Sequence, residues 1–308
     1  MGSLIAELSE LSGMLEKDVR QIAKSAPHRY KHYTIEKRSG GKRPIAQPAK
    51  EVKLLQRILI SHYLCDLPIH PSVTAYEKGT SIRKNADKHS PSGAILKLDF
   101  RDFFPSFRIS DWLTYSEKHD LFDNNEDRVL AGSLMFHQPR GSSVWRLAIG
   151  APASPRLSNL LMYDFDRLVA EHVATHTVVY TRYADDLTFS AARTGYLQPV
   201  EKIVRAVIQE LSFPNLKLND EKKVLATKKY RRSVTGLILT NDDRVSIGRE
   251  RKKLIRSMVD YYRKGKMTRE QKQKLNGLIA FARDVEPEFV SRLETKYGKE
   301  MIESIKHL

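Results

Sequence analysis

The sequence of 308 residues contains a single cysteine, Cys65. One thiol cannot form a disulfide within the chain, and it cannot build a zinc site from several cysteines. The sequence also has no apolar run long enough to cross a bilayer and no recognisable signal peptide. Ala6 stands where an N-myristoylation signal would have serine or threonine. These absences predict a cytoplasmic protein without a membrane partner.

Acidic residues are scarce relative to basic ones. The chain has 37 Asp and Glu against 53 Lys and Arg, which gives a net charge of +16. Such an excess of positive charge is typical of proteins that bind a polyanion, most often a nucleic acid. The length is sufficient for a sizeable core and roughly two or three domains or subdomains.

Hydrophobic periodicity predicts the elements of the first half of the chain. Residues 3–25 and 51–67 have helical spacing. Residues 30–48 resemble a β-hairpin that turns at Ser39, Gly40 and Gly41, and residues 92–100 a strand. Residues 154–173 predict one long helix, with Ser154 as N-cap and Pro155 in the first turn.

The second half combines strands with a basic helical tail. Residues 178–190 predict a hairpin, and residues 216–227 and 233–248 predict further strands with turns. From residue 249 to 274 the tail has 11 Lys and Arg against 3 Asp and Glu. Its apolar stripes, which we expect to pack in a core, are Leu254, Ile255, Met258, Val259 and Tyr262, then Leu275, Leu278, Ile279 and Ala282. The opposite face carries cations that could grip RNA or duplex phosphates: Arg249, Arg251, Lys252, Lys253 and Arg256.

Two adjacent aspartates, Asp185 and Asp186, fall at the tip of the predicted hairpin 178–190. A solvated Asp-Asp turn is one explanation, because Asp is a common turn residue. The strand 92–100, however, carries Asp99 near its end, on the face opposite its apolar residues. Three carboxylates on neighbouring strand ends repel one another unless a cation neutralises them, and Mg²⁺ prefers such oxygen ligands. Two Mg²⁺ ions in such a site can support nucleotidyl transfer, with Mn²⁺ as a possible substitute.

Three segments resemble segments of reverse transcriptases, and they follow one another in the same order along the chain. They are LKLDFRDFFPS (96–106), GAPASPRLSN (150–159) and YADD (183–186). Two more segments, NADKH (85–89) and VTGL (234–237), resemble elements of bacterial retron reverse transcriptases. The resemblance extends from about residue 28 to about residue 260.

This resemblance implies an α/β right-hand polymerase with a largely antiparallel palm sheet. Residues 1–92 would form an N-terminal helix and the fingers, residues 93–235 the palm with a fingers insertion at about 115–150, and residues 236–308 a basic helical thumb. Asp99, Asp185 and Asp186 would be catalytic and bind metal, together with the carbonyl of Phe100. Asp102 is interpreted as a structural turn residue.

The resemblance also implies residues that bind the nucleotide and the nucleic acid. Lys42 and Arg43, with Lys53 as a second candidate, would meet the incoming triphosphate. Phe104 would lie beneath the sugar, while its neighbour Phe103 belongs to the core. Gly150 and Ala151 would pack under the template or nucleotide, although Ile149 replaces the Gln that many relatives have there. Contacts with RNA or DNA are assigned to Asn85, His89, Val234, Thr235, Gly236 and the five cations of the tail.

The implied activity is Mg²⁺-dependent synthesis of DNA on an RNA template from deoxynucleoside triphosphates. In retrons the template is a cognate non-coding RNA, and priming from a guanosine 2′-OH leaves a branched RNA–DNA hybrid, msDNA. The enzyme and its hybrid usually join an effector protein, encoded nearby, in defence against phage. Two alternatives stay open: a group II intron-like or diversity-generating reverse transcriptase, and an RNA-binding scaffold whose catalysis has lapsed.

Overall fold

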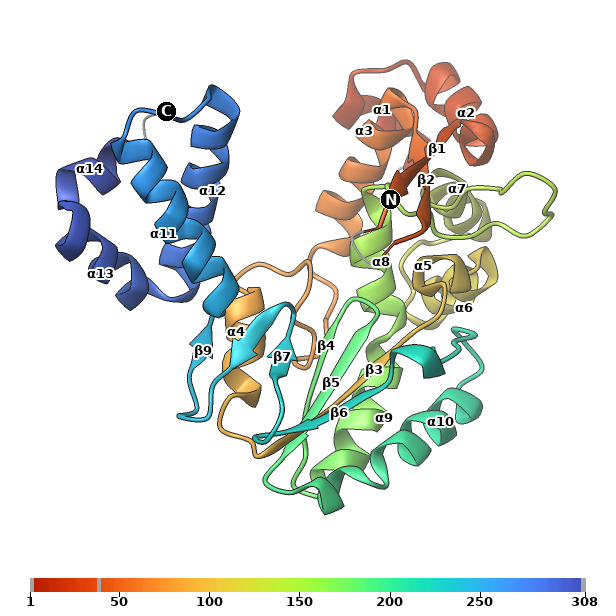
Figure 1. The fold of residues 1–308 in the computed structure, drawn as a ribbon. Coiled ribbons are helices and arrows are strands. Elements are labelled where there is room, and N and C mark those ends of the chain that lie inside the picture. Colours follow the sequence, from red (N-terminus) through yellow and green to blue (C-terminus); the bar gives the residue numbers. More distant parts are fainter. Residues whose placement is uncertain (1–2, 38–39, 306–308) are drawn as a thin grey trace.

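A four-stranded antiparallel sheet lies at the centre of the computed structural model, which describes residues 3–37 and 40–305 (Figure 1). The strands follow the order β4 (Val179–Tyr183), β5 (Asp186–Ala191), β3 (Ala94–Asp99) and β6 (Val224–Thr227). Each strand is antiparallel to its neighbours. The expected antiparallel palm sheet is therefore confirmed.

The two faces of this sheet are covered by different parts of the chain. Leu96 and Leu98 of β3 and Phe189 of β5 belong to the larger core, which also contains residues of α9 (Tyr163–Ala174) and α10 (Val200–Glu210). Ile95 points to the opposite face and joins a second core built mainly by the C-terminal helices. Because successive side chains of β3 point to opposite faces of the sheet, this one strand contributes to both cores.

The fingers are a lobe of helices and one β-hairpin, and the N-terminal part of the chain forms much of it (red to orange in Figure 1). Its hairpin consists of β1 (Tyr30–Glu36) and β2 (Lys42–Pro48), paired from Tyr30 with Pro48 to Glu36 with Lys42. The expected hairpin is confirmed, but Ser39 of its predicted turn lies outside the described residues. The helices of this lobe and of its connections to the palm are α1 (Leu4–Ser12), α2 (Glu16–Ser25), α3 (Lys50–Leu59), α4 (Ile82–His89), α5 (Phe103–Ser106), α6 (Ile109–Lys118), α7 (Asn125–Met135) and α8 (Ala153–Leu161).

Three predicted elements differ from the observed ones. Residues 3–25 form two helices, because Gly13 adopts a left-handed conformation at φ 70° and ends α1. The expected helix 154–173 divides at Met162 into α8 and α9, and its N-cap is Pro152. Ser154 lies inside α8 and donates a hydrogen bond to the Ala148 carbonyl at 2.7 Å.

The third difference concerns residues 216–227, where only the last four form the strand β6. The preceding residues include a 3₁₀ turn at Asp220–Lys222, which is closed by a hydrogen bond from the Lys223 amide to the Asp220 carbonyl. This turn lies beside the end of β3, since the Asn219 amide donates to the Asp99 carbonyl at 2.7 Å.

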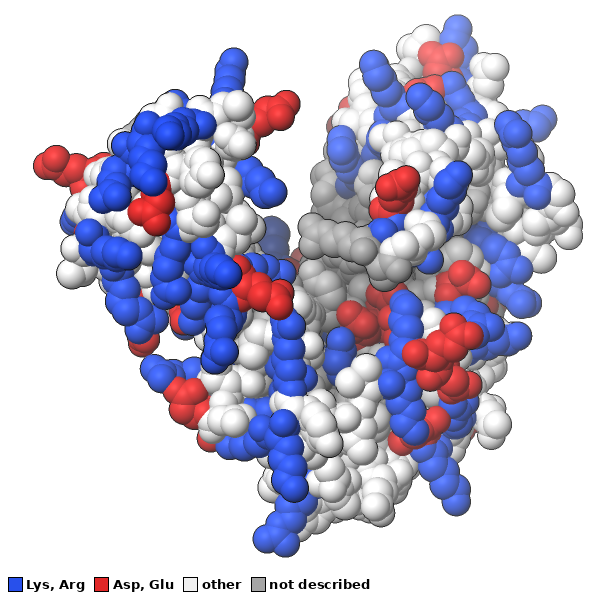
Figure 2. All heavy atoms as spheres, in the orientation of Figure 1, with Lys and Arg blue, Asp and Glu red and all other residues white. Residues whose placement is uncertain are grey.

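The C-terminal lobe, the thumb, has its own hydrophobic core. A small sheet of β7 (Arg232–Val234), β8 (Leu237–Leu239) and β9 (Val245–Ser246) leads into α11 (Arg249–Arg263), α12 (Arg269–Val285), α13 (Pro287–Tyr297) and α14 (Lys299–Ser304). Ile255, Val259, Leu275 and Ile279 are buried as predicted, whereas Leu254 is 42% exposed. An open cleft separates this lobe from the fingers (Figure 2). The expected right-hand architecture is confirmed.

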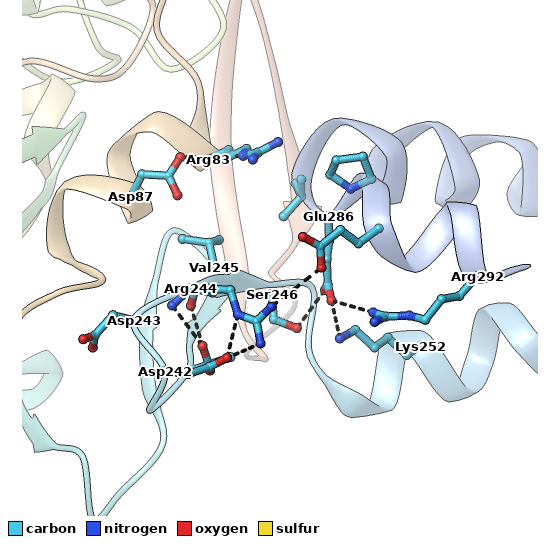
Figure 3. Close-up of a pocket in the computed structure, with 14 residues that line it drawn as sticks. Arg83, Asp87, Asp242, Asp243, Arg244, Val245, Ser246, Lys252, Glu286 and Arg292 are labelled. Carbon is cyan, nitrogen blue, oxygen red and sulfur yellow. Dashed lines mark hydrogen bonds and ion pairs between the residues drawn. The ribbon is translucent and has the colours of Figure 1, made fainter.

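Glu286 holds the base of the thumb together (Figure 3). Its carboxylate accepts hydrogen bonds from the Ser246 hydroxyl at 2.9 Å and from the Lys252 ammonium at 2.5 Å. Arg292 approaches the same carboxylate at 3.7 Å. One acidic side chain therefore joins β9, α11 and α13. No helix within residues 3–37 and 40–305 has the length and apolar character required to span a membrane.

Candidate active site

The three aspartates meet at one edge of the palm sheet. Asp99 is the last residue of β3 and pairs in register with Asp186, the first residue of β5. Asp185 lies in the turn just before Asp186, and its carbonyl accepts a hydrogen bond from the Phe100 amide at 3.1 Å. The turn needs a left-handed residue, which is Ala184 at φ 56°. The strand register thus brings together residues that lie 86 and 87 positions apart in the sequence.

Burial and the repulsion of neighbouring carboxylates make Asp185 and Asp186 hard to ionise. Burial raises the pKa of Asp185, and the negative charge of Asp99 raises it further. Burial also raises the pKa of Asp186 to about 6; Lys97 opposes this rise, while Asp185 and Asp99 add to it. Such shifts indicate a site with uncompensated negative charge.

Lys222 brings a positive charge into direct contact with Asp99. Its ammonium donates to both carboxylate oxygens, at 2.8 and 3.0 Å, and this hydrogen bond raises the pKa of Lys222. The sequence analysis missed Lys222 because it placed residues 216–227 in strands. The signal that could have revealed it is the basic pair Lys222-Lys223, which follows Asn219 and Asp220, two residues that favour a turn.

The donor set fits a divalent cation by its chemistry. Three carboxylates are hard oxygen ligands, and a bound Mg²⁺ would relieve the repulsion that raises the pKa values of Asp185 and Asp186. The ring of Phe100 is buried, and its backbone carbonyl remains the predicted additional ligand. Within the part of the chain that the structure describes, no group of three or more His, Cys, Asp or Glu side chains is arranged to hold a metal ion. The carboxylate held by Lys222 would have to be released for binding.

The shifted pKa of Asp186 predicts a pH-dependent stability. Because its carboxyl binds a proton more tightly in the folded protein, at about 6, than at the ordinary value of 3.8, its contribution to stability falls as pH rises from about 4 to about 6. Mg²⁺ competes with this proton, so we expect Mg²⁺ to raise the melting temperature at pH 7.5 and hardly at pH 5. Thermal melts with Mg²⁺ or EDTA measure the difference.

The matched variant for these melts is Asp186→Asn, which cannot lose a proton. It should lack the step between pH 4 and 6 that the unsubstituted protein shows in EDTA. An equal Mg²⁺ effect at pH 5 and 7.5 would contradict the assignment, as would an undiminished step in the variant.

A buried ion pair fixes the turn that carries Asp185. Arg182 of β4 and Asp166 of α9 are both fully buried, and the guanidinium donates to the carboxylate at 2.7 and 2.8 Å. A third hydrogen bond runs from Arg182 to the Ala184 carbonyl at 3.2 Å. Tyr180 donates its hydroxyl to the same carboxylate at 2.7 Å. Arg182 is therefore a positioning residue that the sequence analysis missed, although a cation within an apolar strand was a visible signal.

Among the residues expected to meet the nucleotide, Arg43 has an observed electrostatic link to the aspartates. The positive charge of Arg43 acts on Asp185 and opposes the rise of its pKa. Lys42 is exposed beside it on β2, and Lys53 is half-buried on α3. Gly150, at φ 111°, lies against β2 so closely that a Cβ atom would come within 2.9 Å of Ile45. Ala151 next to it is buried.

An aromatic row lies next to the aspartates. Phe104 is half-buried, and its ring centroid lies 6.5 Å from that of Tyr76. Tyr76 in turn lies 6.5 Å from Tyr183. Burial raises the pKa of Tyr76, and the charge of Asp185 raises it further. Phe103 is buried and stacks on Phe100, whereas Asp102 is exposed at a left-handed turn with φ 48°.

Three of the residues expected to contact nucleic acid are buried in this structure, which does not favour that role. Asn85 and His89 are fully buried behind the palm sheet, where His89 bonds Ser190 and Thr181 at 2.7 Å each. Burial accordingly lowers the pKa of His89 to about 3. Val234 is also fully buried in the thumb core. These three side chains pack inside the fold and are not exposed on its surface.

Some of the other assigned residues have polar partners within the protein, and others are exposed on α11. Lys252 is paired with Glu286, and Arg251 donates to the Gly236 carbonyl at 3.1 Å. The Thr235 hydroxyl donates to the Ile82 carbonyl at 3.2 Å. Arg249, Lys253 and Arg256 are exposed on α11. Figure 2 shows that Lys and Arg side chains cover much of the thumb surface, to which these three exposed residues belong.

Comparisons with known proteins show the family of this chain. A family model described as reverse transcriptase (RNA-dependent DNA polymerase) matches residues 35–239. The chain is 37% identical over 293 residues to the retron Ec83 reverse transcriptase of Escherichia coli, covering 94% of this chain and 93% of that protein. It is 30% identical over 312 residues to the retron Ec86 reverse transcriptase of the same organism, covering 97% and 92%.

A solved structure with a similar fold is telomerase from Candida albicans in complex with a TWJ fragment of telomeric RNA. The TM-score is 0.52 at 12% identity, over 90% of this chain and 59% of that one. The matched family segment contains β3, β4 and β5, so the fold and the aspartate edge define an RNA-directed DNA polymerase. The chain belongs to the reverse transcriptase family, within the retron reverse transcriptases. The predicted resemblance is confirmed.

Proposed function

We propose that this reverse transcriptase makes DNA with two Mg²⁺ ions held by Asp99, Asp185 and Asp186. The observation that carries the proposal is the register that places Asp99 opposite Asp186, with Asp185 in the adjoining turn. When bound, the ions would lower the pKa of the attacking hydroxyl and neutralise the developing charge. The protein itself would hold the triphosphate with Arg43 and Lys42, and stack the sugar on Phe104.

We further propose that the template is a cognate structured RNA and that synthesis starts from a guanosine 2′-OH of that RNA. The product would be a branched RNA–DNA hybrid. Support comes from the similarity to the Ec83 and Ec86 enzymes over nearly the whole chain. In this proposal residues 1–92 act as fingers, 93–235 as palm and 236–308 as thumb. The enzyme would act in the bacterial cytoplasm, with an effector protein encoded nearby, in defence against phage.

The nucleic acid that copurifies with the protein from its native locus tests this proposal. We expect RNA covalently joined to DNA, in which ribonuclease leaves a DNA strand with a short branched RNA remnant. Digestion with a 2′,5′-debranching enzyme should release linear DNA. RNA without attached DNA would support a lapsed scaffold, and linear DNA extended from a 3′ end would contradict 2′-OH priming.

Phe104 predicts the selection of deoxynucleotides. If its ring packs against C2′ of the incoming sugar, a 2′-hydroxyl is rejected by a clash, and Phe104→Ala should raise ribonucleotide incorporation by about 10-fold or more. Use of deoxynucleotides should fall less. Single-nucleotide extension with dGTP and GTP measures both.

The matched control is Phe103→Ala, whose ring is buried at 4% exposure. It should chiefly destabilise the fold, by about 3–5 kcal/mol, and leave the ratio of dGTP to GTP use unchanged. If Phe104→Ala stays as selective as the unsubstituted enzyme, the ring belongs to the core and does not select the sugar.

A further inference from the structure

A groove beside the base of the thumb carries an exposed aromatic ring among cations. It lies between the β6–β7 turn and the first turns of α11 and has a cavity volume of about 780 Å³. The residues that define this Tyr230 groove are Tyr230, Arg231, Ile238, Gly248, Arg249 and Arg256. It lies outside the aspartate site, and none of the six residues belongs to that site.

The aromatic ring of Tyr230 does not contribute to a hydrophobic core. Its side chain is 72% exposed, more than any other large apolar or aromatic side chain recorded as exposed in the described parts of the chain. The backbone beneath it is nevertheless ordered, because the Tyr230 amide donates to the Thr227 carbonyl at 2.9 Å. The ring is thus presented to solvent by a tight turn, which reduces the entropic cost of binding.

The β6–β7 turn is also tied to the next turn of the thumb sheet. Lys228 donates to the Asp243 carboxylate at 2.7 Å and reaches the Asn241 carbonyl at 3.4 Å. This pair neutralises Asp243 and fixes the wall of the groove. Lys228 and Asp243 are therefore paired with each other. The other cations of the groove remain available to a ligand.

Those remaining cations give the groove a net positive charge. In residues 3–37 and 40–305 no ion pair engages Arg231, Arg249 or Arg256. Arg256 is held by the ring of Phe289, 5.2 Å from its guanidinium carbon. Glu250 is the single acidic residue among those lining the groove. A groove with this balance complements a ligand that carries several negative charges.

We infer that the Tyr230 groove binds an unpaired nucleotide of RNA, with the base stacked on Tyr230 and the flanking phosphates on Arg231, Arg249 and Arg256. A planar ring among arginines is the combination that recognises single-stranded nucleic acid, because every base has a face that can stack. A membrane surface would need several exposed apolar side chains on a convex face, whereas this site is concave with one ring. The inference rests on the proposed function in taking RNA as the partner, and it extends that function by a second RNA contact.

The test measures the affinity of the full chain for an RNA hairpin with an unpaired loop. Tyr230→Ala should weaken this affinity by about 5- to 150-fold, the range for loss of one stacked base. Tyr230→Phe should retain it, because the ring remains. Arg231→Gln should weaken it and lower its salt dependence. Fluorescence anisotropy with the labelled hairpin, a blunt RNA duplex and the DNA hairpin of the same sequence gives all values.

Tyr261→Ala is the matched control, since Tyr261 is 55% exposed on α11 but lies roughly 18 Å further along the helix from Arg249. Equal affinities of the Tyr230→Ala and Tyr261→Ala proteins for the RNA hairpin would overturn the inference. So would an equal loss for the blunt duplex, or a loss confined to the DNA hairpin. Extension of a pre-annealed primer on RNA by the unsubstituted protein tests the proposed function separately, because it needs no hairpin.

Discussion

Asp185→Asn should lower DNA synthesis by about three orders of magnitude or more while RNA binding persists. The substitution keeps the shape of the side chain and removes one anionic ligand from the aspartate edge. A thousandfold loss corresponds to about 4 kcal/mol of transition-state stabilisation, which is plausible for a ligand of a metal that acts on the reacting phosphate. RNA binding depends mainly on basic surfaces away from this edge. Primer extension and RNA affinity, measured on the same protein, separate the two effects.

Asp102→Asn provides the control for this prediction. Asp102 is an exposed aspartate three residues after Asp99, at a left-handed turn that asparagine also tolerates. It should synthesise DNA at a rate close to that of the unsubstituted enzyme. Near-normal synthesis by Asp185→Asn would disprove the two-metal proposal, whereas an equal loss in both variants would show that any removed charge near β3 has this effect.

The aspartate edge could be predicted because its signals are local. Asp99 ends an alternating strand, and Asp185 and Asp186 interrupt a hairpin, so the sequence itself indicates where each strand ends. Antiparallel pairing of these strands then brings the carboxylates together. The same reasoning predicted β3, the β1–β2 hairpin and the helical tail, since each has a clear period of two or of 3.6 residues.

Other features depended on contacts that no local pattern encodes. Lys222 reaches Asp99 across 123 positions, and Tyr76 enters the site from a loop without periodicity. Asn85 and His89 were recognised as a motif, yet a motif does not say whether its side chains face solvent or the back of a sheet. The break of the helix at Met162 has no Gly or Pro as a signal. Tertiary packing decides such positions, and it overrides local propensity.

The buried ion pair between Arg182 and Asp166 connects the core of the palm with the turn that carries Asp185. Asp166→Ala should destabilise the protein by about 3–5 kcal/mol, because it leaves the Arg182 guanidinium buried without its carboxylate. Arg167→Ala on the same helix breaks an exposed pair with Glu171, and it should cost at most about 1 kcal/mol. Urea unfolding followed by circular dichroism measures both. Equal costs would mean that the buried pair contributes no more than a surface pair.

The double variant Asp166→Leu, Arg182→Met distinguishes stability from positioning. Replacing both partners by apolar side chains removes the unpaired charge, so the double variant should recover much of the stability lost in Asp166→Ala. It should not recover DNA synthesis, because the hydrogen bond from Arg182 to the Ala184 carbonyl that fixes the Asp185 turn is absent. A misplaced metal ligand lowers the rate even in a well-folded enzyme. If the double variant is both stable and fully active, Arg182 serves the fold alone, and the turn holds Asp185 without it.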